Sequence, residues 1–188
     1  IRSAGADVVL TGNWGQDLSL LVKASKEAGL DAVFYTLNAH NAGIPGSLGK
    51  AGAEHVRQVV GWHANVANNK LEKTAADYRK RFGEDYWLYW PKLQIDMVAK
   101  AIDTAKSADP VKVAHALHGM KFESATGAVE MRAIDHQLVA PEYIATFTKA
   151  GGAVKYDAEG TGYGWKTDVR IEAKDVAPPT TCRMSVPK

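Results

Sequence analysis

The segment ADVVLTGNWGQDLSLLVKASKEAGLDAVFYT, residues 6–36, decides the fold class. An apolar run at 7–12 predicts a strand that ends at Thr-Gly, and a second apolar run at 32–36 predicts another. Between them, Asp17 is a candidate helix N-cap, Leu18, Leu21 and Val22 follow at helical spacing, and Gly29 ends the helix. Strand, helix and strand of these lengths are typical of a parallel α/β unit.

The segments on either side extend this unit. Residues 1–5 are typical of the last turn of a helix closed by Gly5, which indicates a fragment whose earlier residues, any signal peptide included, precede Ile1. Residues 43–55 are rich in Gly and Ala and predict a short helix before a third strand at 56–62. The sequence therefore predicts the beginning of a doubly wound domain.

The composition of the sequence changes after Trp62. The residues that follow are polar and typical of a loop, which suggests that the chain crosses to another domain. Helices are predicted at 71–82, from the first turn around Pro91 to Ala105, and from the Asp109-Pro110 cap to Leu117. We expect the long helix to bury a stripe of Ile95, Val98, Ala99, Ile102 and Ala105. Strands are expected within 120–175, at 127–131, 143–148 and 167–172.

Composition and charge exclude several classes of function. The chain of 188 residues is 46% hydrophobic and 23% charged, which is ordinary for a globular protein. Its formal net charge is only +2 with no basic face, which argues against a nucleic-acid partner. No apolar run approaches the roughly 20 residues that span a bilayer.

The motifs of common enzyme classes are absent, so we expect no catalytic residues, no cofactor and no metal. Gly12-Asn13-Trp14-Gly15 is not the dinucleotide fingerprint, and Gly43–Ala51 lacks the Ser or Thr of a phosphate-binding loop. His115 and His118 lie one turn apart, but no further ligand accompanies them, and exposed helix histidines are the better interpretation. There is no GxSxG nucleophile motif.

Polar and aromatic residues follow the first two predicted strands. Asn13 and Trp14 come after the first strand, and Asn38 and Ala39 after the second. Ligands of open parallel sheets bind at the carboxyl ends of the strands, so these four residues form a candidate ligand site. Alternatively, Trp14 is a packing residue and Asn38 a turn former.

Four segments together resemble the type 1 periplasmic binding proteins of the leucine/isoleucine/valine family. They are AGADVVLTGNWGQDLSLLVKASKEAGL, DPVKVAHALHGMKFESATGAVEMRAIDHQL, TGYGWKTDV and PPTTCRM. The resemblance implies about the second half of a bilobate α/β protein built on doubly wound parallel sheets. It assigns 1–61 to the second lobe, 62–138 to the first, and 139–188 to a strand returning to the second lobe and a C-terminal tail. Helices within 93–117 would then expose apolar faces, because most of the first lobe lies outside this chain.

The resemblance also implies site residues. The family's aromatic ligand contact matches Trp14, and its acidic contact matches Asn38, an amide, so a ligand without an ammonium group competes with an amino acid. From the first-lobe side, Tyr86 or Trp87 is expected to contact the ligand. Cys182, the single cysteine, would form a disulfide with a cysteine of the other half in an oxidising periplasm.

The function that the resemblance implies is that of a non-catalytic solute-binding subunit. Such a protein captures a branched-chain amino acid, an aromatic or other organic acid, or an amide, and delivers it to an ABC permease in the membrane. Its expected partners are that ligand, the permease and the remaining N-terminal half, without nucleic acid. The alternative is a ligand-sensing receptor or an amide-responsive regulatory domain of the same fold.

Overall fold

The computed structural model describes residues 1–185, which form two compact units. One unit comprises Ile1–Trp87 and Tyr143–Arg170, and the other comprises Leu88–Glu142 and the chain from Ile171 onward. The expected division into lobes at residues 61 and 138 concerns a two-lobed assembly and stays a prediction.

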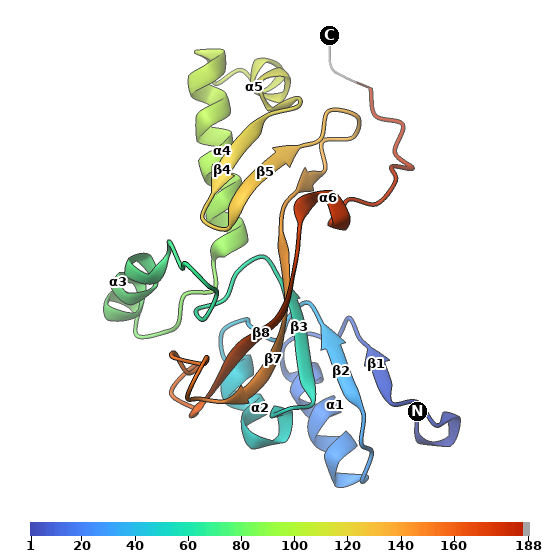
Figure 1. The fold of residues 1–188 in the computed structure, drawn as a ribbon. Helices are drawn as coiled ribbons and strands as arrows, with labels where there is room; N and C mark the ends of the chain where they lie inside the picture. The colour runs from blue at the N-terminus through green and yellow to red at the C-terminus, as the bar shows by residue number, and fades with distance from the viewer. Residues whose placement is uncertain (186–188) are drawn as a thin grey trace. The chain divides into compact units, whose positions relative to one another are not determined.

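The first unit is built on a five-stranded sheet in the order β1-β2-β3-β7-β8 (Figure 1). β1, β2 and β3 are parallel, with Val8 opposite Val33 and Phe34 opposite Val56, which confirms the strand–helix–strand prediction. β7 returns antiparallel to β3, with Tyr143 opposite Val60, so the sheet is mixed. The strands are β1 (Val8–Leu10), β2 (Val33–Thr36), β3 (Val56–Val60), β7 (Glu142–Lys149) and β8 (Tyr163–Ile171).

Two helices pack against this sheet and close its core. α1 (Gln16–Glu27) and α2 (Ile44–Gly52) lie side by side in Figure 1. Leu18 and Val22 of α1 and Leu48 of α2 meet the buried strand residues Phe34 and Phe147. The unit also contains the short 3₁₀ helix η1 (Arg2–Ala4), which Gly5 ends in the left-handed conformation, and α3 (Glu72–Phe82), which ends at Gly83.

The second unit combines helices with a small antiparallel sheet. Its helices are α4 (Tyr89–Ala105), α5 (Pro110–Leu117) and α6 (Ala173–Val176). β4 (Lys121–Ser124), β5 (Gly127–Met131) and β6 (Leu138–Val139) form the sheet in that order. The buried Tyr89 hydroxyl of α4 reaches Ser124 and Thr126 at 3.3 and 2.6 Å, and so links α4 to the β4–β5 turn.

The stripe that α4 buries differs from the predicted one. Tyr89, Leu93, Met97 and Ala101 are buried, whereas Ile95, Val98 and Ile102 are exposed. The prediction was wrong because α4 is apolar on two faces, and helical spacing alone cannot tell which face is covered. The exposed apolar face expected on the helices within 93–117 is present on α4, whereas the apolar side chains of α5 are partly buried.

The two predicted helix caps have different outcomes. Asp109 caps α5 as predicted, because its carboxylate accepts the backbone N–H groups of Val111 and Lys112 at 3.1 and 3.0 Å. Asp17 is not an N-cap: α1 begins after Gly15, and Asp17 lies inside its first turn. Gly15 adopts φ 59°, which favours glycine.

Among residues 1–185, no helix is both long and apolar enough to cross a lipid bilayer.

The β1 edge of the larger sheet is uncovered, with Leu10 80% exposed.

Candidate ligand-binding cavity

A cavity of about 690 Å³ lies within the first unit, where segments that follow β2 and β3 meet α3 and the β7–β8 connection. This volume falls in the range of small-molecule sites. The residues that line it and carry the argument below are His40, Trp62, His63, Asn65, Glu72, Arg79, Asp85, Tyr86, Trp87, Tyr156, Asp157, Glu159 and Trp165.

Aromatic side chains form much of the cavity wall. Trp62 and Trp165 are buried, and Tyr86 packs edge-on against Trp62 with ring centroids 5.5 Å apart. The Trp62 indole N–H donates to Asn69 Oδ1 at 3.0 Å, which fixes the plane of the ring. Planar apolar walls of this kind favour flat or branched apolar ligand groups.

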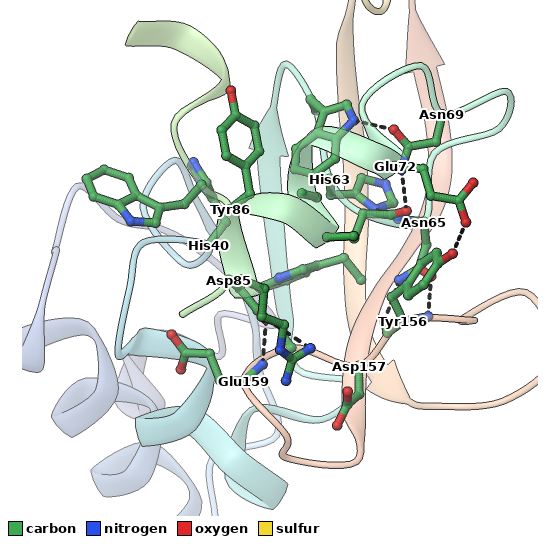
Figure 2. A pocket seen from close by; sticks show the side chains of 18 of the residues that line it. His40, His63, Asn65, Asn69, Glu72, Asp85, Tyr86, Tyr156, Asp157 and Glu159 are labelled. Carbon is green, nitrogen blue, oxygen red and sulfur yellow. Dashed lines mark hydrogen bonds and ion pairs between the residues drawn. The ribbon is translucent and has the colours of Figure 1, made fainter. Parts of the chain in front are cut away.

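Two histidines lie at the inner side of the cavity (Figure 2). His63 Nδ1 accepts the Asn65 backbone N–H at 3.3 Å, so Nε2 carries the proton and donates to Thr167 Oγ1 at 2.8 Å. Burial lowers the pKa of His63 to about 3, and nearby His40 lowers it further in the same direction. Burial also lowers the pKa of His40 to about 4, against a smaller opposing effect of Gln58. Both rings are therefore neutral at neutral pH.

The segment Tyr156–Glu159 borders the cavity and is tied to three other segments. Asn65 pairs with the Tyr156 backbone, donating to its carbonyl and accepting its N–H, both at 2.8 Å. The Glu159 carboxylate accepts the N–H groups of Gly43 and Gly46 at the start of α2, at 2.5 and 2.7 Å. The Glu159 backbone N–H donates to Asp85 at 2.7 Å (Figure 2).

The remaining acidic side chains of the wall are also engaged. Asp85 forms an ion pair with Arg79 at 3.3 Å. Glu72 accepts from the Tyr156 hydroxyl and from Lys155, the latter at 3.0 Å. Asp157 accepts the Gly162 backbone N–H at 3.0 Å.

Two of the six predicted ligand residues line this cavity, namely Tyr86 and Trp87. Asn13 and Trp14 lie in the exposed loop after β1, and Asn13 bonds locally with Thr11 through its backbone N–H and side chain. Asn38 is half-buried, and its backbone N–H donates a hydrogen bond to Thr36 Oγ1 at 3.2 Å. Ala39 is fully buried. These four residues do not line the cavity.

Sequence reasoning missed most of the cavity wall. His40 is one residue beyond the predicted pair at the end of β2, and Trp62 and His63 follow β3 after Gly61. Applying the strand-end rule to the third predicted strand, at 56–62, would have found His63. Tyr156 and Glu159 carried no such signal, because only the tertiary fold brings the β7–β8 connection to this place.

The histidines of α5 do not form a cluster of metal ligands. His115 is exposed, and His118 Nδ1 lies 3.2 Å from His136 Nε2. Within residues 1–185, no group of three or more His, Cys, Asp or Glu side chains is arranged to hold a metal ion.

The architecture is that of an α/β protein with a ligand-sized cavity beside the carboxyl ends of its parallel strands. Residues 1–153 match the family model described as periplasmic binding protein, and the chain belongs to this family. The family consists of solute-binding proteins rather than enzymes, as the sequence predicted.

Relatives and solved structures agree with this assignment. Leu/Ile/Val-binding protein homolog 4 of Brucella abortus is 31% identical over 173 residues, covering 88% of this chain and 40% of the relative. A leucine-, isoleucine-, valine-, threonine- and alanine-binding protein of Pseudomonas aeruginosa is 28% identical, over 68% of this chain and 34% of its own length.

Among solved structures, the corresponding Brucella ovis protein in a closed conformation has a TM-score of 0.85 at 27% identity, covering 99% of this chain and 49% of that one. A Rhodopseudomonas palustris solute-binding protein in complex with 3,4-dihydroxybenzoic acid has a TM-score of 0.74 at 20% identity, covering 93% and 48%. The chain therefore spans less than half the length of these relatives, and the predicted periplasmic-binding-protein fold, as a partial chain, is confirmed.

Proposed function

We propose that the full-length protein carrying this chain is a periplasmic solute-binding subunit of an ABC importer. It captures an amino acid or an organic acid and delivers it to a membrane permease. Family membership supports the class of function, and the cavity of about 690 Å³ in the first unit supports small-molecule capture. That cavity is the observation that carries the proposal.

The proposed ligand contacts combine the cavity with the strand-end residues. Tyr86 and Trp87 supply aromatic contact from the cavity wall. Asn13, Trp14 and Asn38 are proposed to contact the ligand from the loops after β1 and β2, once the remaining part of the protein completes the site. Ala39, the fourth predicted residue of these loops, is fully buried in the core and is therefore proposed only to support the loop beside Asn38. The names of the relatives suggest aliphatic amino acids or hydroxylated benzoic acids as ligands.

A thermal-shift screen of the full-length protein tests the proposal. Leucine, isoleucine, valine, phenylalanine, benzoate, 3,4-dihydroxybenzoate and small amides would be added one at a time. A ligand at a hundred times its Kd stabilises the folded state by about 2.7 kcal/mol, which raises the melting temperature by several degrees. If neither these compounds nor a wider set of amino and organic acids raised it, solute capture would be refuted.

A further inference from the structure

Two histidines from separate segments of the second unit meet at their ring nitrogens. His118 Nδ1 lies 3.2 Å from His136 Nε2, and the ring centroids are 5.4 Å apart. His118 directly follows α5, whereas His136 lies in the connection between β5 and β6. The pair therefore joins segments 18 residues apart in the chain, and their contact lies at the protein surface, where a dissolved ion can reach it.

Backbone hydrogen bonds hold both histidines in place. The His118 N–H donates to the His115 carbonyl at 3.2 Å, where α5 ends. The His136 N–H donates to the Arg132 carbonyl at 2.7 Å, and His136 adopts φ 51°, a left-handed conformation that is uncommon outside glycine. The Arg132 N–H donates to the Gln137 carbonyl at 2.9 Å and closes the turn. Positions fixed in this way lower the entropic cost of binding a shared ion.

The charge in the same turn is balanced. An unpaired guanidinium close to the histidines would repel a cation, but Arg132 Nε donates to Asp135 Oδ1 at 2.8 Å and Arg132 Nη1 donates to the Pro178 carbonyl at 2.7 Å. The hydrogen bond from Arg132 keeps the pKa of the Asp135 carboxyl well below its ordinary value. Asp135 is therefore ionised at neutral pH and offsets the arginine charge.

The separation of the two nitrogens fits a shared metal ion. Imidazole nitrogens bind Zn²⁺ at about 2.0–2.1 Å, so two of them on one ion lie about 2.9 Å apart at a right angle and about 3.3 Å apart in a tetrahedron. The observed 3.2 Å falls between these values. In the metal-free pair, one nitrogen carries the proton of a hydrogen bond to the other. On chelation that proton moves to the second nitrogen of the same ring, so that both facing nitrogens present lone pairs.

From this geometry we infer that His118 and His136 form a two-histidine site for a divalent transition-metal ion and bind Cu²⁺ more tightly than Ni²⁺ or Zn²⁺. Imidazole suits all three ions, and the affinity of nitrogen sites is highest for Cu²⁺. Water completes the coordination, because no third His, Cys, Asp or Glu within residues 1–185 is placed to join the pair.

The two protein ligands define what such a site does. Structural and catalytic zinc sites use three or four protein ligands, so an ion held by two histidines is exchangeable. While bound, the ion ties the end of α5 to the β5–β6 connection. This inference goes beyond solute capture and does not depend on the cavity of the first unit.

Titration of the tag-free, full-length protein with Cu²⁺ tests the site. His118→Gln and His136→Asn each remove one nitrogen ligand and should weaken Cu²⁺ binding about tenfold or more in isothermal titration. Asn is chosen at position 136 because it tolerates the left-handed conformation. Unchanged affinity in either variant would overturn the site.

His115→Gln is the matched control, because it removes the exposed histidine one turn before His118 on α5. Its Cu²⁺ affinity should stay within about twofold of the unchanged protein. An equal loss in this control would move the chelate to the two histidines of α5 and refute the pairing with His136.

Electron paramagnetic resonance of the unchanged protein provides a readout that does not depend on how the variants fold. Bound Cu²⁺ should show coupling to two nitrogen ligands, and a spectrum without nitrogen coupling would also overturn the site. Melting temperatures of the metal-free variants within about 2 °C of the unchanged protein show that weaker binding is not a loss of fold.

Discussion

At the residue scale, the buried histidines are the most informative feature of the cavity. His63 is only 3% exposed and holds both the Asn65 turn and Thr167 of β8 through one tautomer. Protonation would convert Nδ1 from an acceptor into a donor and break the bond from Asn65. The folded state therefore favours neutral His63, as its pKa of about 3 indicates.

This preference makes stability depend on pH. His63 titrates near 6.5 when unfolded and near 3 when folded, so the unfolded state binds more protons between these values. Stability is then fully present above pH 6.5 and falls as the pH drops toward 3. From pH 6.5 to 5 the free energy of unfolding should fall by about 2 kcal/mol through His63.

Urea denaturation of the full-length protein at both pH values measures this loss. His63→Gln should flatten the pH dependence relative to the unchanged protein. His115→Gln, at an exposed position of α5, serves as the control and should retain the full pH dependence. Identical pH profiles for all three proteins would contradict the assignment to His63.

Trp14 provides a second test at this scale. It is 71% exposed in the loop after β1, so removing its ring should leave the fold intact. If Trp14 contacts the ligand as the family resemblance implies, Trp14→Ala lowers the affinity for the best ligand of the screen by an order of magnitude or more. Unchanged affinity, measured by isothermal titration, would remove Trp14 from the site.

At the element scale, α4 shows why spacing alone misled the prediction. Its two apolar faces are equivalent in sequence, but only the Tyr89–Ala101 face packs within the second unit. The other face, with Ile95 68% exposed, has no cover within the described chain.

Two positions on α4 test this orientation. Met97 is 1% exposed, and Met97→Ala should lower the free energy of unfolding by about 2–4 kcal/mol through the cavity it leaves. Ile95→Ala on the opposite face should cost less than about 0.5 kcal/mol in the 188-residue chain. Urea denaturation of both variants measures these losses. A larger loss of unfolding free energy for Ile95→Ala than for Met97→Ala would support the buried stripe predicted from the sequence.

The two aspartates at helix starts form another matched pair. Asp109→Ala deletes the acceptor of two backbone N–H groups of α5 and should cost about 1 kcal/mol. Asp17→Ala removes only a favourable charge in the first turn of α1, worth about 0.5 kcal/mol. Comparable losses in thermal or urea unfolding would argue against the assigned caps.

At the scale of the whole molecule, uncovered apolar surface recurs in both units. Leu10 on the β1 edge and Ile95 on α4 are exposed in a chain that spans less than half the length of its relatives. Contiguous exposed apolar surface commonly marks an interface. We expect the rest of the full-length protein to cover these residues.

Cys182 also concerns the whole molecule, because its expected disulfide joins this chain to the rest of the protein. It is the single cysteine of the chain and is free and exposed, so a disulfide requires a cysteine outside these residues. The family resemblance implies such a bond, and its reduction should lower the melting temperature of the full-length protein. Cys182→Ser should reproduce that shift without reductant. A melting temperature that neither reductant nor the substitution changes would exclude the bond.

The sequence by itself determined the parallel unit of residues 6–36 and the Asp109 cap, because each rests on short-range spacing or local capping. The family followed from the resemblance of four segments along the chain. It also placed Tyr86 and Trp87 among the candidate ligand residues. Only the tertiary structure decided which face of α4 is buried and which side chains surround the cavity. The physical reason is that burial and cavity walls depend on contacts between distant segments. The bonds of Glu159 to Gly43 and Gly46 cross more than a hundred residues of chain, and no local pattern encodes them.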